Sequence, residues 1–437
     1  AGIMSGDDAV LTVEDSCITT KGAARGAMFA GGNSKLYVKN CEISAEDGVL
    51  PWDYEDNVMP GNMRRVPWML GLRGNCRATN LADYADALYE DCTITSEAWG
   101  VMSTDGVRRC RLNLKNCDVA ITGPSGYGAF SIGDCIDTFE DCRIDVPDYA
   151  LIMANETASG VFKNTKVDAG RFAVMCFRNE GGKLVITDGS VMNTDETTVV
   201  VKGCAPIIEA DNCVLSPGNG IILQVMNSDD PGNPAGYYKD PTEDDTFDPA
   251  HDNKTARETY DVIATFKNMT VTGDFYNGST GKKGDTGPKM EMAPPPGAGP
   301  GPEGPGGPGG PGGPGGGPGG PGAKGNGYDG VRNMALTFDN ATVTGIISAS
   351  KALHRVEKVF KDNCEELGEV VNTAQPVVNN GVIVTLKNGA VWTVAGTSYL
   401  SSLTIDDTSS VVGTLLVDGK ETALVPGVYT GALTLTI

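Results

Sequence analysis

The residues best suited to chemistry in this chain are charged and amide side chains that follow short apolar segments at similar intervals. They are Arg73, Asp105, Asn155, Arg178, Lys202 and Gln224. Glycoside cleavage by acid–base chemistry needs two carboxylates that face one bond. An elimination reaction needs a base, and Lys202 or Arg178 could serve as that base. The candidate catalytic residues are therefore Asp105, Arg178 and Lys202, and the candidate ligand-binding residues are Arg73, Asn155 and Gln224.

Aromatic side chains near these positions could stack on sugar rings. Trp52 and Trp68 are candidate ligand-binding residues, while Trp99 and Tyr127 could equally fill the core.

Several features oppose catalysis. Asp105 has no partner carboxylate at a recognisable spacing, and a lone aspartate is more often a turn former. The chain has two histidines, His251 and His354, and neither has a nearby serine or cysteine arrangement. No phosphate loop, dinucleotide fingerprint or zinc-ligand spacing occurs. The sequence therefore favours a non-catalytic protein and leaves an enzyme as the alternative.

The elements that would position these residues come from a repeat with one Asn or Asp per unit. Where nothing is inserted, the spacing is 23 to 25 residues. The repeated residues are Asp15, Asn40, Asp91, Asn116, Asp141, Asn164, Asp188, Asn212, Asn268, Asn340 and Asn388. Asn and Asp tolerate the left-handed backbone conformation, so each is predicted to form a one-residue corner.

Apolar residues alternate with polar ones on both sides of each corner, which predicts two short strands per unit. In the stretch 112–123, Leu112, Leu114, Cys117 and Val119 show this pattern. A third apolar segment recurs about ten residues later, as in 99–106 and 149–156. We therefore expect an all-β solenoid with three strands per rung, paired in parallel.

These features resemble the right-handed parallel β-helix of the pectate-lyase-like superfamily. The resemblance covers residues 8 to 227 well and 259 to 437 with interruptions, and it implies a fold more than an activity. Ser103-Thr104-Asp105-Gly106 resembles the Asn-Thr-Asp-Gly motif of polygalacturonases, but the paired aspartates, Gly-His-Gly and Arg-x-Lys of those enzymes are missing. The stretch 384–405 resembles autotransporter and haemagglutinin-type β-helix repeats.

Five of the twelve cysteines follow the corner residue directly. They are Cys41, Cys92, Cys117, Cys142 and Cys213. Identical residues at one repeat position stack in a solenoid, so we predict buried free thiols. Cys110 and Cys135 form a second equivalent pair, for which a disulfide between neighbouring rungs is an open alternative.

Two long loop insertions interrupt the repeat, and loops of solenoids often carry binding sites. The first spans 51–67. The second spans 227–261 and is strongly acidic. Its carboxylates could hold Ca²⁺, although no EF-hand spacing is present and a solvated acidic loop is the simpler interpretation.

A third insertion, 274–328, is rich in Gly and Pro. From Gly301 to Gly325 every third residue is glycine, as a collagen triple helix requires. It would be either a collagen-like tether between subunits or a linker.

The domain prediction is a β-helix over 1–273, this collagen-like insertion, and further β-helix over 329–437. Residues 350–371 are expected to be irregular, with one or two helical turns.

The composition limits the partners. A net charge of −22 opposes binding to nucleic acid, and no apolar stretch is long enough for a membrane span. A first residue other than Met suggests a processed N-terminus, so we expect a secreted, extracellular or cell-surface protein. Repeats that begin and stop abruptly at the two ends could stack end to end.

Two functions follow from these observations. The first is a non-catalytic structural or adhesive β-helix that forms a homo-oligomer or filament, or displays binding loops. The alternative is a polysaccharide lyase or glycoside hydrolase that binds a carbohydrate in a groove along the third strands.

Overall fold

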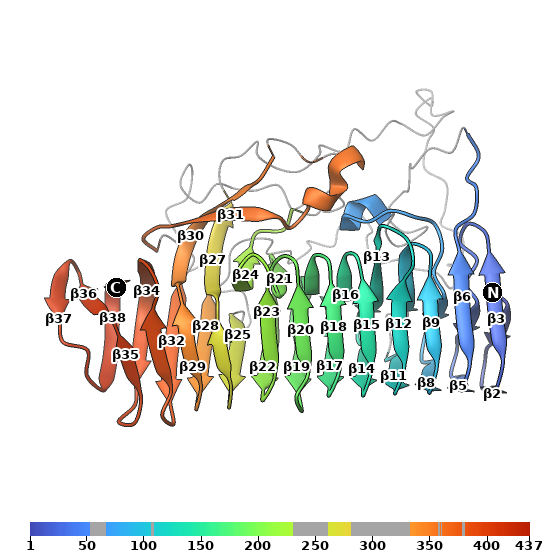
Figure 1. Cartoon of the computed structure of the whole chain (residues 1–437), viewed down its shortest axis with the longest axis horizontal. Helices are drawn as coiled ribbons and strands as arrows, with labels where there is room; N and C mark the ends of the chain where they lie inside the picture. The colour runs from blue at the N-terminus through green and yellow to red at the C-terminus, as the bar shows by residue number, and fades with distance from the viewer. Residues whose placement is uncertain are drawn as a thin grey trace, which may run out of the picture.

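The computed structural model describes residues 1–52, 67–105, 109–229, 261–280, 333–356, 359, 361–377 and 381–437. This part of the chain is all-β apart from two short 3₁₀ helices, η1 (Pro67–Leu70) and η2 (Lys361–Glu366). The strands form long parallel sheets side by side along the molecule (Figure 1). No helix in the described ranges is long and apolar enough to cross a membrane.

Sheet A contains the recurring third segments, which confirms that they are strands. Its parallel strands are β1 (Ile3–Ser5), β4 (Met28–Ala30), β7 (Thr79–Leu81), β10 (Trp99–Thr104), β13 (Gly126–Ile132), β16 (Tyr149–Glu156), the first part of β19 (Phe172–Thr187), β21 (Val199–Lys202), β24 (Ile221–Met226), β27 (Asp274–Thr280) and β30 (Ile347–His354).

Sheet B contains the strands that precede the corners. They are β2 (Val10–Glu14), β5 (Lys35–Lys39), β8 (Asp86–Glu90), β11 (Arg111–Lys115), β14 (Ile136–Glu140), β17 (Ser159–Lys163), the second part of β19, β22 (Ala205–Asp211), β25 (Val262–Lys267), β28 (Met334–Asp339), β32 (Val382–Lys387) and β34 (Ser398–Ile405).

The strands that follow the corners form two further sheets. Sheet C contains β3 (Cys17–Lys21), β6 (Glu42–Glu46), β9 (Thr93–Ser96), β12 (Asp118–Ile121), β15 (Arg143–Val146), β18 (Lys166–Ala169), β20 (Val191–Thr194) and β23 (Val214–Pro217). Sheet D contains β26 (Thr270–Thr272), β29 (Thr342–Gly345), β33 (Val391–Val394) and β35 (Ser410–Val412).

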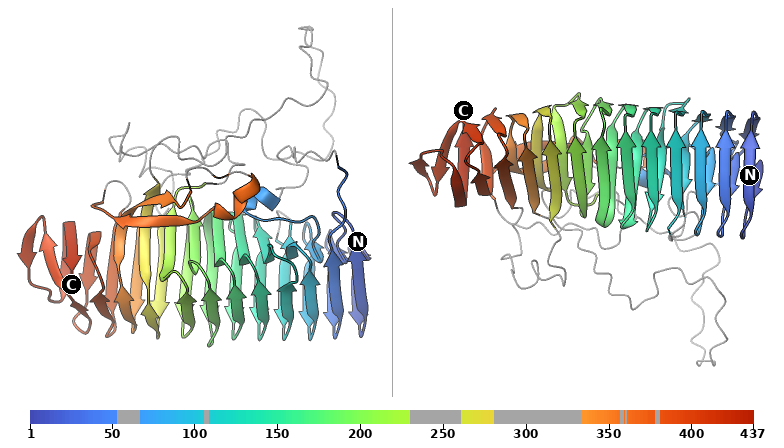
Figure 2. Two further views of the ribbon diagram at one scale, coloured as in Figure 1. Left: turned by 45° about the horizontal axis from the view of Figure 1, so that its top comes forward. Right: turned by 90° about the horizontal axis from the view of Figure 1, so that it is seen from below.

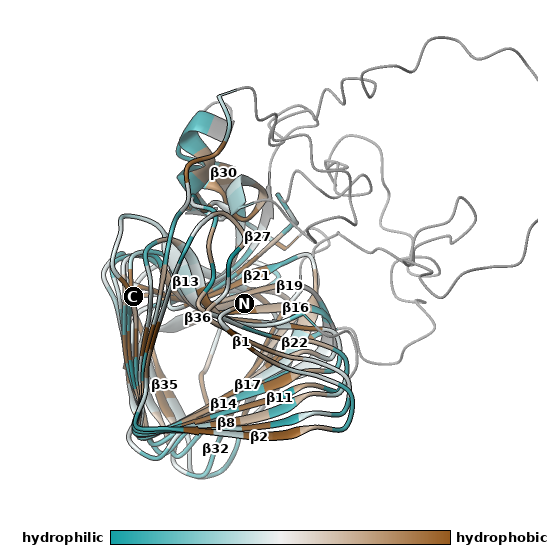
Figure 3. Ribbon diagram, turned by 90° about the vertical axis from the view of Figure 1, so that its right-hand side faces the viewer, coloured by the Kyte–Doolittle hydropathy of each residue, from teal (hydrophilic) through white to brown (hydrophobic). Residues whose placement is uncertain are grey.

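The sheets enclose one apolar interior, seen end-on in Figure 3. Up to β30, strands pair in parallel with strands of the next repeat, and Arg111 of β11, for example, pairs with Ile136 of β14. Alternate side chains then point inward, and those of Leu112 and Leu114 are fully buried. Long parallel sheets around an apolar interior are consistent with the expected β-helix or solenoid.

The corner prediction is confirmed at every position. All eleven repeated Asn and Asp residues have a φ between +46° and +57°. The side chains also connect neighbouring repeats, since Asn116 Nδ2 donates to Asp91 Oδ1 at 2.7 Å and Asn164 Nδ2 to Asp141 Oδ1 at 2.6 Å. The corner residue thus sets the backbone turn and joins one repeat to the next.

Charges alternate in sign along the row just before the corners. In register order this row reads Glu14, Lys39, Glu90, Lys115, Glu140 and Lys163. Opposite charges on neighbouring strands stabilise a sheet and like charges destabilise it. A strand that paired two repeats away would meet a like charge, so the row favours the correct order of stacking.

The predicted thiol column is also confirmed. All twelve cysteines are thiols, including Cys110 and Cys135, for which a disulfide was the alternative. In the column, Cys92 Sγ donates to Glu90 O at 3.1 Å and Cys142 Sγ to Glu140 O at 3.1 Å. All five thiols are buried in the core, and those of Cys41, Cys92, Cys117 and Cys142 donate to the backbone just before their own corners.

The C-terminal part departs from the parallel pattern. β38 (Gly427–Thr436) pairs antiparallel with β34 and with β36 (Thr414–Val417), which also pairs with β37 (Lys420–Thr422). Residues 350–371 contain the expected helical turn, η2, and lead into β31 (Val370–Ala374), which pairs antiparallel with β30.

The three insertions fall largely outside the described residues. The ranges that are not described include 53–66, 230–260 and 281–332. The second range contains His251 and the predicted Ca²⁺ loop, and the third contains the collagen-like run. The first seven residues of the predicted Gly-rich insertion, Asp274–Thr280, form β27.

Candidate functional site

The outer face of sheet A is where the candidate site residues were expected to form a groove. Its central row, in register across β13, β16, β19 and β21, is Phe130, Ile152, Met175 and Val200. All four side chains are buried in a second apolar cluster that also contains Leu70 and Leu72. From β13 to β21, sheet A is therefore apolar on both faces and needs a cover on the outside.

Two segments distant in sequence supply this cover (Figures 1 and 2). One is η1 with the residues that follow it, up to Arg73. The other, which we call the strap, is residues 361–371 and consists of η2 and the start of β31. Leu70 and Leu72 of the first segment and Val370 of the strap pack on the row. The two segments together cover this row on the outer face of sheet A.

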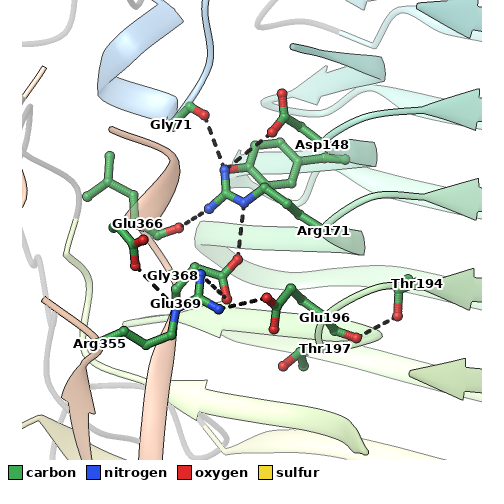
Figure 4. Close-up of polar contacts among 12 residues, drawn as sticks. Gly71, Asp148, Arg171, Thr194, Glu196, Thr197, Arg355, Glu366, Gly368 and Glu369 are labelled. Carbon is green, nitrogen blue, oxygen red and sulfur yellow. Dashed lines mark hydrogen bonds and ion pairs between the residues drawn. The ribbon is translucent and has the colours of Figure 1, made fainter. Parts of the chain in front are cut away.

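Arg171, just before β19, joins both covering segments to the sheet (Figure 4). Its Nε donates to Glu369 Oε1 at 3.1 Å and its Nη2 to the carbonyl of Leu367, both in the strap. Its Nη1 donates to the carbonyl of Gly71 at 3.1 Å and to Tyr149 Oη at 2.7 Å. Five donors in a fixed fork suit a residue that must hold several acceptors at once.

The geometry of Gly71 explains why the first segment fits so closely. This residue has a φ of +77°, and a Cβ placed on it would lie 2.7 Å from Tyr149 Oη. Any other residue would push the segment away from Arg171.

Arg355, which follows β30, makes a second set of ion pairs in Figure 4. Its Nη1 lies 2.7 Å from Glu196 Oε1, its Nε lies 3.2 Å from Glu366 Oε2, and its Nη2 lies 3.5 Å from Glu369 Oε2. Glu369 thus lies between two arginines. Burial nevertheless raises the pKa of Glu369 to about 7, because desolvation outweighs the attraction of Arg171 and Arg355.

A third polar group lies at the far end of β21. Lys202 Nζ is 2.6 Å from Asp229 Oδ1, and His354 Nε2 is 3.1 Å from Asp229 Oδ2. The N–H of Gly368 also donates to Asp229 Oδ2. Burial alone would raise the pKa of Asp229, but Lys202 and His354 outweigh it and hold this pKa well below its ordinary value. Asp229 therefore connects sheet A, β30 and the strap.

The N-terminal end of sheet A has a different arrangement. Arg77 Nη1 lies 2.7 Å from Asp105 Oδ2, which also accepts from Asn80 Nδ2 at 3.0 Å. The Arg77 guanidinium lies 4.8 Å from the centre of the Trp99 ring. A cavity of about 150 Å³ beside this group is lined by Met4, Phe29, Arg77 and Asn80, among others.

The structure does not bring the candidate catalytic residues together. Asp105 follows β10 and Lys202 ends β21, and the four strand spacings between them amount to about 19 Å. Lys202 is 1% exposed. The register places Arg178 one position beyond Lys202, because Phe177 pairs with Lys202, and the Arg178 side chain lies outside the described residues. Their catalytic assignment stays a prediction.

The candidate binding residues are also dispersed. Arg73 pairs with Glu365 of the strap at 2.8 Å. Gln224 is buried and accepts from Asn372 Nδ2 at 2.6 Å. Asn155 has a φ of +60° at the end of β16. Trp68 lies in η1, whereas Trp52 is 97% exposed.

The sequence analysis missed Arg171, Arg355, Glu369 and Asp229. The acidic run Glu365-Glu366 with Glu369 was a signal that the strap carries charge. Its partners could not be read from the sequence, because Arg171 and Glu369 are 198 residues apart.

Comparison of this chain with protein-family models gives no match, and comparison with curated proteins gives none either.

Proposed function

We propose that this chain is a non-catalytic structural or adhesive protein of the extracellular space or cell surface. In this proposal it is a right-handed parallel β-helix of the pectate-lyase-like type with three strands per rung, and its insertions are the parts that contact partners. The observation that supports it best is the burial of the outer face of sheet A under η1 and the strap. A polysaccharide has no continuous groove to follow there.

The polar groups on this face support the same proposal. Lys202 and Arg171 are buried in ion pairs with acids from other segments. Charges paired in this way fasten a structure, and none of these basic side chains is available to take a proton from a substrate. Asp105, the one candidate acid, pairs with Arg77.

Self-assembly is part of the proposal, in the form of a homo-oligomer or filament. The antiparallel strands in the C-terminal part disfavour stacking through that part. Its outermost strand, β37, is three residues long and contains Lys420 and Glu421, and short charged edge strands resist pairing with another sheet. These strands therefore disfavour end-to-end stacking through the C-terminal part.

The alternative function is a polysaccharide lyase or glycoside hydrolase. The cavity beside Arg77 favours it, because Phe29 lies there together with the guanidinium of Arg77 and the amide of Asn80, and such a lining suits a sugar ring. Asp105 pairs with Arg77 and Asn80, whereas hydrolysis needs two carboxylates that face one bond.

The proposal is tested by incubating the full chain with a panel of soluble and insoluble polysaccharides. We expect no release of reducing ends or unsaturated products, whether or not the chain is retained on the polysaccharide. Product release that disappears in the Asp105→Asn variant would replace the proposal by the enzyme alternative. Electron microscopy of the same sample distinguishes separate rods from filaments.

A further inference from the structure

The strap is held to sheet A by a group of charges that do not balance. Glu369 lies between Arg171, which precedes β19, and Arg355, which follows β30. The same two arginines also pair with Asp148, which precedes β16, Glu196 between β20 and β21, and Glu366 of η2. Four carboxylates thus share two guanidinium groups, of which that of Arg171 is buried and that of Arg355 is 40% exposed.

The remaining titratable groups near Glu369 do not correct the imbalance. Tyr149 Oη accepts from Arg171 and is fully buried. On the other side, Asp229 accepts from the N–H of Gly368, next to Glu369, and its charge is matched by Lys202. Glu369 is the strap residue of the group and is only 3% exposed. It is therefore the carboxylate best placed to take up a proton.

We propose that the strap is a proton-controlled cover, which is closed while Glu369 is protonated and opens more readily once Glu369 is ionised. Opening would uncover the part of the apolar row on sheet A that the strap covers, at its Val200 end. An apolar strip of this kind binds other apolar surfaces. The switch goes beyond the proposed scaffold function and does not depend on it.

The direction follows from proton linkage. Burial raises the pKa of Glu369 to about 7, whereas its ordinary value, expected in the open state, is 4.5. The closed state therefore binds the proton more tightly, and closure is favoured at acid pH and weakened as the pH rises. With these two values, the equilibrium constant for opening rises on the order of tenfold between pH 6 and pH 8 and levels off above pH 8.

Hydrogen exchange of the full chain tests this, because exchange reports local opening. The reporting amide is that of Gly368, because it donates to Asp229 Oδ2 outside the strap. The amides of Leu367 and Glu369 donate to Cys364 O and Glu366 O within the strap, so they report whether the strap itself unfolds. Protection factors are corrected for the intrinsic pH dependence of exchange. We expect strap protection to fall about tenfold from pH 6 to pH 8, while amides of β11 and β14 change little.

The variant Glu369→Gln should remove this pH dependence and keep the strap closed at pH 8. The matched control is Glu365→Gln on the same element, since Glu365 is 52% exposed and pairs with the half-exposed Arg73. This control should keep the pH dependence of the unchanged chain. Constant strap protection from pH 6 to pH 8 would overturn the proposal, and so would an unchanged response in Glu369→Gln.

A second variant covers the case in which Glu369→Gln does not fold. Glu196 pairs with Arg355, and its negative charge helps to raise the pKa of Glu369. Glu196→Gln should therefore move the midpoint of the pH response to lower pH. A midpoint that stays in place or moves upward would contradict the switch.

Discussion

At the scale of single residues, the corners show how much of this fold is local. Asn116 could be placed from the sequence because few residue types accept a φ near +50°, and its conformation is the predicted one. The position of Lys202 in a strand could also be predicted from the sequence, because it belongs to one of the recurring third segments. Its burial could not, because the partner Asp229 and the strap above it come from other parts of the chain.

The corner can be tested by comparing Asn116→Val with Asn116→Gly. Both variants lose the hydrogen bond to Asp91. Only Val carries the steric cost of the left-handed conformation, about 1–2 kcal/mol or more for a β-branched residue. Urea unfolding followed by circular dichroism should show a lower midpoint for Val than for Gly. Equal midpoints would mean that this corner does not depend on the conformation of Asn116.

At the scale of elements, the strands were predictable and the cover was not. Alternating apolar residues such as Leu112 and Leu114 predict strands of sheet B, because the pattern has a period of two. The helical turn at η2 was also expected. Nothing in the sequence of η2 or η1 indicates that both lie on sheet A, since that arrangement depends on Arg171 and on apolar contacts between distant segments.

The ion pair of Lys202 with Asp229 should be important for keeping the strap in place. Lys202→Met would leave the buried Asp229 carboxylate without its closest cation and should lower the free energy of unfolding by about 3–5 kcal/mol. Adding Asp229→Asn to Lys202→Met should recover part of the loss, because the uncompensated charge is removed. Chemical unfolding of the three variants at pH 7 measures this, and an unaffected Lys202→Met chain would rule out a stabilising role.

The ion pair of Lys202 with Asp229 should also make the stability of the folded chain fall at acid pH. The pKa of Asp229 is depressed in the folded chain, so its stabilisation is complete above its ordinary pKa, about 3.9, and is lost as the pH falls below that value. This sign is opposite to that of Glu369. Thermal unfolding between pH 2.5 and pH 5 should show a smaller loss on acidification in Asp229→Asn than in the unchanged chain. Identical acid profiles would contradict this role.

At the scale of the whole molecule, the repeat encloses its thiols. Cys17 is exposed and the eleven other cysteines are buried. Alkylation of the native chain should therefore label one cysteine within minutes, and unfolding without reductant should make all twelve reactive. Intact mass measurement counts the labels. Fewer than twelve after unfolding would reveal disulfides, for which Cys110 and Cys135 would be examined first.

The central proposal is that this molecule is a non-catalytic scaffold, and it is supported by the covered outer face of sheet A. The most direct measurement is the release of oligosaccharides from a broad polysaccharide panel by the purified full chain, followed by mass spectrometry over a day. The account predicts no product above that of a chain heated to unfolding. Steady product release by the native chain, abolished in Asp105→Asn or Lys202→Met variants that remain folded, would contradict it.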